Sequence, residues 1–111
     1  MMEDRELLRA YAKSRSEQAF AELVRRHTDL VYSAALRRAG DADLAKDVTQ
    51  MVFIDLAKKA KLLSDKIILT GWLYRSTRYA ANNVLRSERR RRERETVAMQ
   101  LTERASEGQS V

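Results

Sequence analysis

Basic, aromatic and amide side chains recur along one side of the stretch that follows Gly71. On a helix, which turns about 100° per residue, they fall within about 140° of arc. Arginine makes salt-dependent contacts with phosphates, tyrosine can stack on an unpaired base, and asparagine can read base edges through paired hydrogen bonds. This chemistry predicts a nucleic-acid-binding face, and its residues are Arg75, Arg78, Tyr79, Asn82, Asn83, Arg86, Arg89 and Arg90.

Two other interpretations of this basic face are a helix that is merely soluble and a helix that anionic lipid attracts. A solvated helix usually mixes charge signs, whereas this face has no acid between Gly71 and Ser87. A lipid-binding helix should carry bulky apolar residues on its opposite side, where Thr77, Ala80 and Ala81 stand instead. Nucleic acid is therefore the favoured ligand.

A second candidate surface lies on the predicted helix at residues 42–61, on the side opposite Val52. Two carboxylates, an amide and an exposed isoleucine form a mixed face that suits a basic helical partner. The alternative is a solvated face with one isolated apolar residue, which is common. The residues are Asp43, Asp47, Gln50 and Ile54, with Met51 at the border.

The sequence lacks the residue combinations that catalysis would need. It has no Cys, one His and no glycine-rich phosphate loop, so the residues that would build a nucleophilic, metal or nucleotide site are missing. His27 is predicted to be a partly buried, hydrogen-bonded ring, and Trp72 a core anchor rather than a base-stacking wedge. We therefore expect no enzyme, no cofactor, no metal and no small-molecule substrate.

The elements that must position these faces are helices. With no Pro and three Gly in 111 residues, the chain is rich in helix-forming residues and suggests one domain. Ser14 to Glu17 offers an N-cap, and Gly40-Asp41 ends one helix and caps the next. We expect an all-α bundle of about four helices with a long basic C-terminal helix. The predicted helices cover residues 4–13, 17–38, 42–61 and about 70 to beyond 94.

The remaining segments complete this picture. Residues 62–70 are predicted to form a loop, residues 1–101 the domain, and residues 102–111 a disordered tail or truncated linker. The second predicted helix should bury a single apolar face. Its residues are Phe20, Leu23, Val24, His27, Leu30, Val31 and Ala34.

The positive charge is concentrated in one quarter of the chain. The net charge is +6, and residues 71–95 alone hold 8 Arg against 3 Glu. This concentration indicates a polyanion-binding element rather than a generally basic surface. No apolar run approaches the roughly 18 residues of a membrane span, and the first residues do not form a signal peptide. We expect a soluble, cytoplasmic protein.

Four fragments carry a family resemblance. They are AFAELVRRH at 19–27, GD at 40–41, AKDVTQMVF at 45–53, and GWLYR at 71–75 leading into NVLR at 83–86. In this order and spacing, residues 17–92 resemble region 2 of the bacterial RNA polymerase sigma-70 family, most closely its extracytoplasmic-function (ECF) group. Departures from the family pattern are Lys46 and Met51, where Glu is common, and Tyr79, where Asn is frequent.

The resemblance implies partners and roles. In that family the third helix, through Asp-x-x-Gln, docks on the β′ clamp of core RNA polymerase, and the match here is Asp47 and Gln50. The next loop and the fourth helix recognise and help melt the promoter minus-ten element, with a non-template base flipped into a pocket beside the loop. The implied loop is residues 62–70, and an anti-sigma factor is a further partner that the family allows. The implied DNA contacts are Arg75, Arg78, Asn82, Asn83 and Arg86.

Full-length family members carry a second helical domain that reads the minus-thirty-five element. No room for it remains after residue 95, so we expect either an excised domain or a shortened protein. Two rival functions stay open. A generic basic module would bind duplex as well as single-stranded nucleic acid, and a protein-interaction bundle docking on an acidic partner would show no preference among oligonucleotides.

Overall fold

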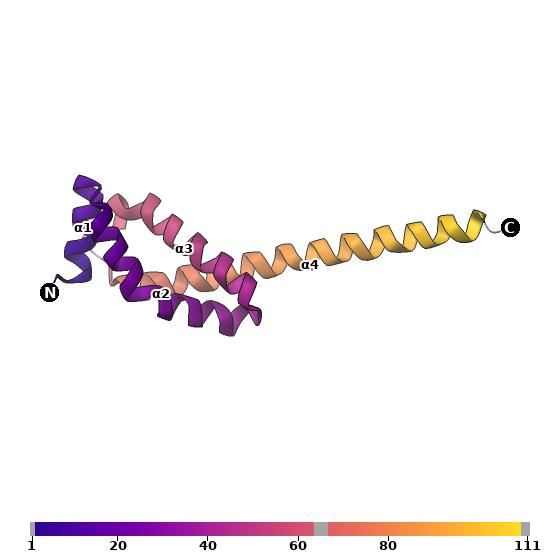
Figure 1. The fold of residues 1–111 in the computed structure, drawn as a ribbon, viewed down its shortest axis with the longest axis horizontal. Helices are drawn as coiled ribbons and strands as arrows, with labels where there is room; N and C mark the ends of the chain where they lie inside the picture. Colours follow the sequence, from indigo (N-terminus) through magenta and orange to yellow (C-terminus); the bar gives the residue numbers. More distant parts are fainter. Residues whose placement is uncertain (1, 64–66, 110–111) are drawn as a thin grey trace.

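The computed structural model describes residues 2–63 and 67–109, which form four α-helices and no strand. The helices are α1 (Asp4–Ser14), α2 (Glu17–Ala39), α3 (Ala42–Leu63) and α4 (Leu69–Gln109). The helices α2, α3 and the beginning of α4 pack together with α1 at one end, and α4 then projects alone (Figure 1). The predicted all-α architecture is confirmed.

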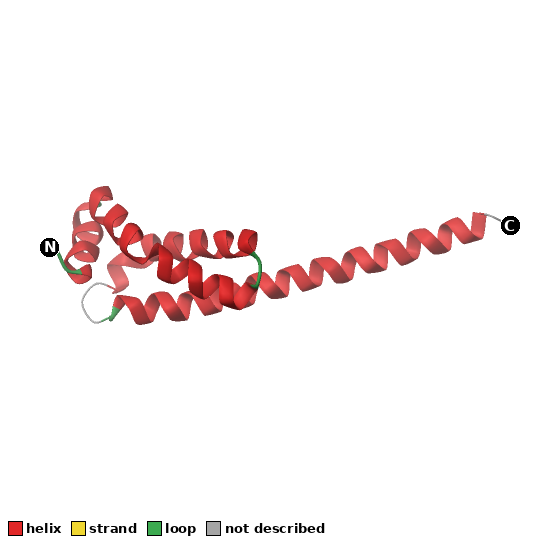
Figure 2. Cartoon of the chain, turned by 60° about the horizontal axis from the view of Figure 1, so that its bottom comes forward, coloured by secondary structure: helices red, strands yellow, loops and turns green. Residues whose placement is uncertain are grey.

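Local capping fixes the start of α2 and the α2–α3 connection. The Ser16 hydroxyl accepts a hydrogen bond from the Ala19 amide at 3.2 Å, and the Asp41 carboxylate accepts one from the Leu44 amide at 3.0 Å. Gly40 has a φ of 71°, the left-handed conformation that glycine adopts without a steric penalty. The resulting connection is short, so α2 and α3 lie side by side (Figure 2). These predicted caps are confirmed.

The loop between α3 and α4 is shorter than the predicted 62–70. Helix α3 extends through Leu63 and α4 begins at Leu69, and residues 64–66 lie outside the described residues. Leu63 and Leu69 are both buried in the core, and their burial stabilises the helical turns that contain them. The predicted loop was therefore too long at both ends.

The segment predicted to be a disordered tail is helical as far as Gln109, and residues 110–111 lie outside the described residues. No Pro interrupts it, and Ala, Leu, Met, Gln, Glu and Arg all favour helix. At about 1.5 Å per residue, α4 is about 60 Å long, most of the 75 Å length of the molecule. The division of the chain at residue 101 stays a prediction.

One residue of the predicted α2 apolar face lies outside the core. Leu30 is 41% exposed, whereas Leu23 and Val31 are fully buried. Helix α1 explains the difference, because its first residue, Asp4, contacts the side chain of His27. Helix α1 therefore does not reach Leu30, one turn further along α2.

Asp4 joins α1 to α2 through two side chains. Its carboxylate lies 2.7 Å from the His27 Nε2 and accepts a hydrogen bond from Arg26 at 3.2 Å. His27 was predicted to be partly buried and hydrogen-bonded; its hydrogen bond is confirmed, and the ring is buried. Hydrogen bonds from Arg25 and then Arg26 lower the pKa of Glu22, and its carboxylate in turn is the main cause of the raised pKa of Arg26. Asp4 therefore adds a polar link between α1 and α2 to the apolar contacts that α1 makes with the core.

We expect Asp4→Ala to destabilise the fold by about 1–3 kcal/mol, because a nearly buried imidazole loses its partner. Urea unfolding followed by circular dichroism measures this as a lower midpoint with an unchanged slope. Asp29→Ala, at an exposed position on α2, is the control and should leave the midpoint in place. A wild-type midpoint for Asp4→Ala would contradict the structural role of this polar link.

Candidate functional site

The packing of α4 decides which of its side chains face outward. Leu69, Leu73, Thr77 and Ala81, spaced four residues apart, are buried against the bundle. The Thr77 hydroxyl donates to the Leu73 carbonyl at 2.6 Å, so this buried polar group is satisfied. Seven of the eight predicted nucleic-acid contacts are consequently exposed, and Asn82 is half-buried. All eight lie away from the buried stripe, and they line several different hollows.

Three of the eight line a pocket between α3 and α4, of about 630 Å³. They are Arg75, Tyr79 and Asn83, and Trp72 and Ser76 of α4 line it as well. Helix α3 supplies the opposite wall. We call this hollow the α3–α4 pocket, and its α3 residues are Met51, Val52, Ile54, Asp55, Lys58 and Lys59.

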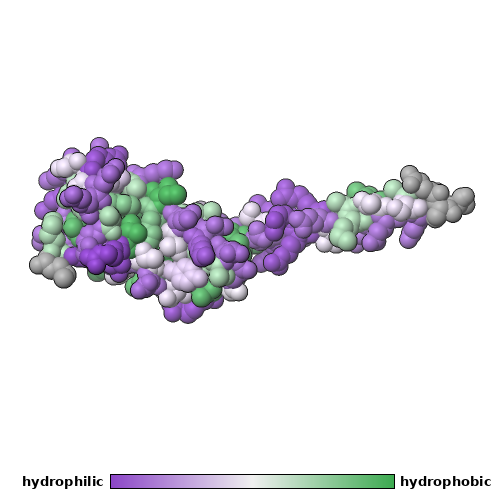
Figure 3. All heavy atoms as spheres, viewed as in Figure 1, coloured by the Kyte–Doolittle hydropathy of each residue, from purple (hydrophilic) through white to green (hydrophobic). Residues whose placement is uncertain are grey.

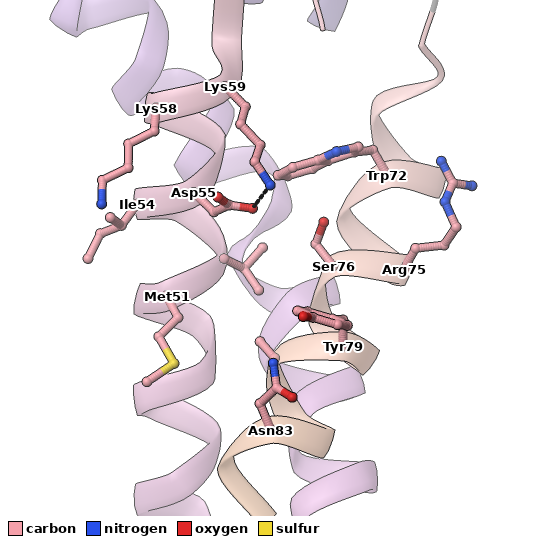
Figure 4. A pocket seen from close by; sticks show the side chains of 12 residues that line it. Met51, Ile54, Asp55, Lys58, Lys59, Trp72, Arg75, Ser76, Tyr79 and Asn83 are labelled. Carbon is pink, nitrogen blue, oxygen red and sulfur yellow. Dashed lines mark hydrogen bonds and ion pairs between the residues drawn. The ribbon is translucent and has the colours of Figure 1, made fainter. Parts of the chain in front are cut away.

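The α3–α4 pocket combines aromatic rings, an apolar floor and a basic rim. Figure 4 shows the Trp72 indole directed from α4 toward α3, with Tyr79 further along the same helix. Lys59 is held by Asp55, whose carboxylate accepts a hydrogen bond at 3.1 Å, on the α3 wall. Tyr79 is 69% exposed. Such a site suits a flat aromatic ligand that carries negative charge next to its ring.

Four other predicted contacts lie along the part of the exposed α4 face that is nearer α2. Arg78, Asn82, Arg86 and Arg89 line two adjoining hollows that also contain residues of α2. Arg90 belongs to neither group and lines a separate hollow on the projecting part of α4. Figure 3 shows hydrophilic side chains gathered around this part of α4. The single predicted face thus borders α3 along one edge and α2 along the other, and a hydrogen bond from Arg86 to Asn83 joins the two groups.

The predicted face of α3 is exposed as expected. Asp43, Asp47 and Gln50 face solvent, and Met51 and Ile54 are 48% and 55% exposed. Met51 and Ile54 also line the α3–α4 pocket, so the two surfaces predicted separately adjoin one another. A partner on α3 and a ligand in the pocket would be close neighbours.

Sequence reasoning missed some of the lining residues. Trp72 was predicted as a core anchor, and it does pack against the core, but it also lines the pocket. Lys58 was not singled out, although it lies four residues after Ile54 and so on the same side of α3. Arg37 and Arg38 were not singled out either, because the last turn of a helix often carries basic residues for its own stability.

Two other kinds of site are absent from the described part of the chain. Within it, no group of three or more His, Cys, Asp or Glu side chains is arranged to hold a metal ion. No helix in residues 2–63 and 67–109 combines the length and the apolar character that crossing a bilayer requires.

Comparison with known proteins gives one family match. The model of the family described as Sigma-70 region 2 matches residues 23–91, from the first half of α2 to the arginine-rich part of α4. This range covers well over half of the chain and contains every candidate site residue. No curated protein and no solved structure matches the chain.

Proposed function

Since this chain belongs to the sigma-70 region 2 family, we propose that it binds core RNA polymerase and captures the unwound minus-ten element of a promoter. The family consists of transcription-initiation factor domains, so the proposed role is binding rather than catalysis. The proposed group within the family is the ECF group, on the sequence fragments described above. The proposed place of action is the bacterial cytoplasm, where RNA polymerase works.

The observation that carries this proposal is the pairing of Trp72 and Tyr79 in one pocket with Arg75 at its edge. Unpaired bases stack on aromatic side chains, and cations beside the rings hold the phosphates that link those bases. A paired base inside a duplex cannot enter such a pocket. The α3–α4 pocket is therefore proposed to bind bases of the non-template strand after the duplex has opened.

The energies involved are of the right size for strand opening. Stacking one base on an aromatic side chain contributes about 1–3 kcal/mol. Losing one base-pair step of a DNA duplex costs about 1.4 kcal/mol on average. Capturing one or two bases would therefore offset the free energy of opening a similar number of base-pair steps. Phosphate contacts and the polymerase would supply the rest of the free energy of opening.

The exposed face of α3 supports the polymerase part of the proposal. Asp47 and Gln50 offer a carboxylate and an amide to basic or amide groups of a partner helix, and Met51 and Ile54 add apolar area beside them. Interface centres usually combine a few anchoring polar groups with such apolar contact. Because this face adjoins the α3–α4 pocket, polymerase bound there would hold the domain next to the opened strand.

Co-elution of the purified chain with core RNA polymerase tests the proposed function directly. We expect the chain to elute with core enzyme on size-exclusion chromatography and to be absent from that fraction when core enzyme is omitted. A chain that stays folded but does not co-elute would contradict the proposal and favour a generic nucleic-acid-binding module.

For the pocket, we expect Tyr79→Ala to weaken binding of a single-stranded minus-ten oligonucleotide about tenfold, because one stacking platform is lost. The salt dependence of binding should hardly change, since no cation is removed. Fluorescence anisotropy across a salt series measures both quantities.

Met99→Ala is the control, because Met99 is also a large exposed side chain on α4 but does not line the α3–α4 pocket. Its affinity for the same oligonucleotide should stay within about twofold of wild type, as for most surface changes. Equal losses for Tyr79→Ala and Met99→Ala would show that the α3–α4 pocket has no special role.

A further inference from the structure

A second basic site lies between α2 and α4, along the edge of the exposed α4 face that is nearer α2. It consists of two hollows of about 370 and 600 Å³ that share Arg37 and Arg38 from the last turn of α2. We call the two together the α2–α4 cleft. Five arginines line it, and they are Arg37, Arg38, Arg78, Arg86 and Arg89.

The charge in this cleft is not neutralised within the molecule. Among the described residues, no carboxylate lines either hollow, and none of the five guanidinium groups forms an ion pair. Like charges held close together repel, so this arrangement raises the free energy of the unliganded chain. An anion that bridges the two helices would relieve that repulsion.

Hydrogen bonds hold two of the guanidinium groups in place. The Arg38 Nε donates to the Asn82 side-chain oxygen at 2.8 Å and so links the end of α2 to α4. Arg86 donates from one terminal nitrogen to the Asn83 side-chain oxygen at 2.6 Å. A guanidinium has five N–H donors, so each arginine keeps several for a ligand. Such a prearranged group loses less side-chain entropy on binding an anion.

Stabilisation of α2 explains only part of this cluster. Arg37 and Arg38 lie in the last turn of α2, where a positive charge interacts favourably with the helix dipole. Arg78, Arg86 and Arg89 lie within α4, far from its C-terminal turn at Gln109, so the dipole gives no reason for them. Five arginines on two helices that line two adjoining hollows instead match a polyanion with regularly spaced charges.

We propose that the α2–α4 cleft binds backbone phosphates of DNA, with Arg37 and Arg38 as its second wall. This inference rests on the proposed function, because it assigns the DNA backbone to the α2 edge of the exposed α4 face and the unpaired bases to its α3 edge. The arginines of the cleft follow α4 from residue 78 to residue 89, about 16.5 Å at 1.5 Å per residue. One strand of a duplex has a phosphate about every 3.4 Å of helix axis, so this length spans about five successive phosphates. Phosphate contacts carry no sequence information, so the cleft contributes affinity and register rather than base preference.

The test is the variant Arg37→Gln/Arg38→Gln, titrated with one DNA sequence as a duplex and as its single strand across a salt series. If both arginines contact phosphates, the slope of log K against log salt should fall by about 1.8 on duplex DNA, or about 1.4 on a single strand. We expect affinity at low salt to fall at least about tenfold, to the same extent for different base sequences. The form of DNA, duplex or single strand, on which affinity and slope fall is the form that supplies the phosphates.

Arg5→Gln/Lys13→Gln is the matched control, since it removes the same charge from exposed positions on α1, and Lys13 also lies in the last turn of a helix. Its slope should match that of the wild-type chain. Suppose that the wild-type chain binds DNA and that Arg37→Gln/Arg38→Gln has the wild-type slope on both forms of DNA. This result would overturn the inference and leave the proposed function standing. Failure of the wild-type chain to bind either form would instead count against both.

Discussion

A chain that carries Asp47→Ala and Gln50→Ala is expected to lose roughly 100-fold or more of its affinity for core RNA polymerase. Truncating a residue at the centre of an interface commonly costs about 2 kcal/mol, and about 1.4 kcal/mol corresponds to a tenfold change in affinity. Asp47 is the more important of the two, because a charged hydrogen bond is stronger than a neutral one. Co-elution with core enzyme at a series of chain concentrations measures the loss.

The fold should tolerate these changes. Both side chains are exposed on α3, and alanine has a higher helix propensity than either residue. The control is Gln18→Ala/Asp29→Ala, which removes the same two residue types from exposed positions on α2. Unaltered co-elution of the α3 variant would exclude this face as the polymerase contact. Equal losses in both variants would point to a general charge effect.

Local signals in the sequence predicted most of the fold. Ser16 and Gly40 act within one or two turns of their own position, so their roles as caps follow from residue type alone. The 3.6-residue period located the buried stripe of α4 and, from it, the exposed side chains on the rest of that helix. These features do not depend on which helix packs where.

The features that the sequence did not reveal depend on tertiary packing. The periodicity of α4 gives one outward face, but only the positions of α2 and α3 decide which helix each edge of that face borders. Arg38 approaches Asn82 across 44 positions of sequence, and no local pattern predicts such a contact. Leu30 stands at a position where the helical spacing predicts burial. It is nevertheless exposed, because the part of α2 that α1 covers stops one turn before Leu30.

The exposed C-terminal part of α4 was missed for a different reason. Residues 91–108 are exposed throughout, so the usual sign of a stable helix, a buried apolar stripe, is missing there. Continuation from a packed helix removes the need for a new nucleus, which is the costly step in helix formation. Absence of an apolar face was therefore a poor argument against helix in this segment.

The second large effect is expected from reversing charge on α4. Arg75→Glu/Arg78→Glu should weaken binding of the minus-ten oligonucleotide by roughly 100-fold at low salt, because two phosphate contacts become repulsions. Arg75 lies at the α3–α4 pocket and Arg78 in the α2–α4 cleft, so the double variant acts on both proposed DNA sites. Each side chain is exposed, and glutamate is nearly as good a helix former as arginine.

Salt separates this electrostatic effect from a loss of fold. The difference between variant and wild type should shrink steadily as salt rises, since counterions screen both attraction and repulsion. Arg5→Glu/Lys13→Glu makes the same change in net charge on α1 and should retain most of the affinity. An α4 variant with wild-type affinity across the whole titration would remove α4 from the DNA interface. In that case an acidic protein partner would be the better explanation of its arginines.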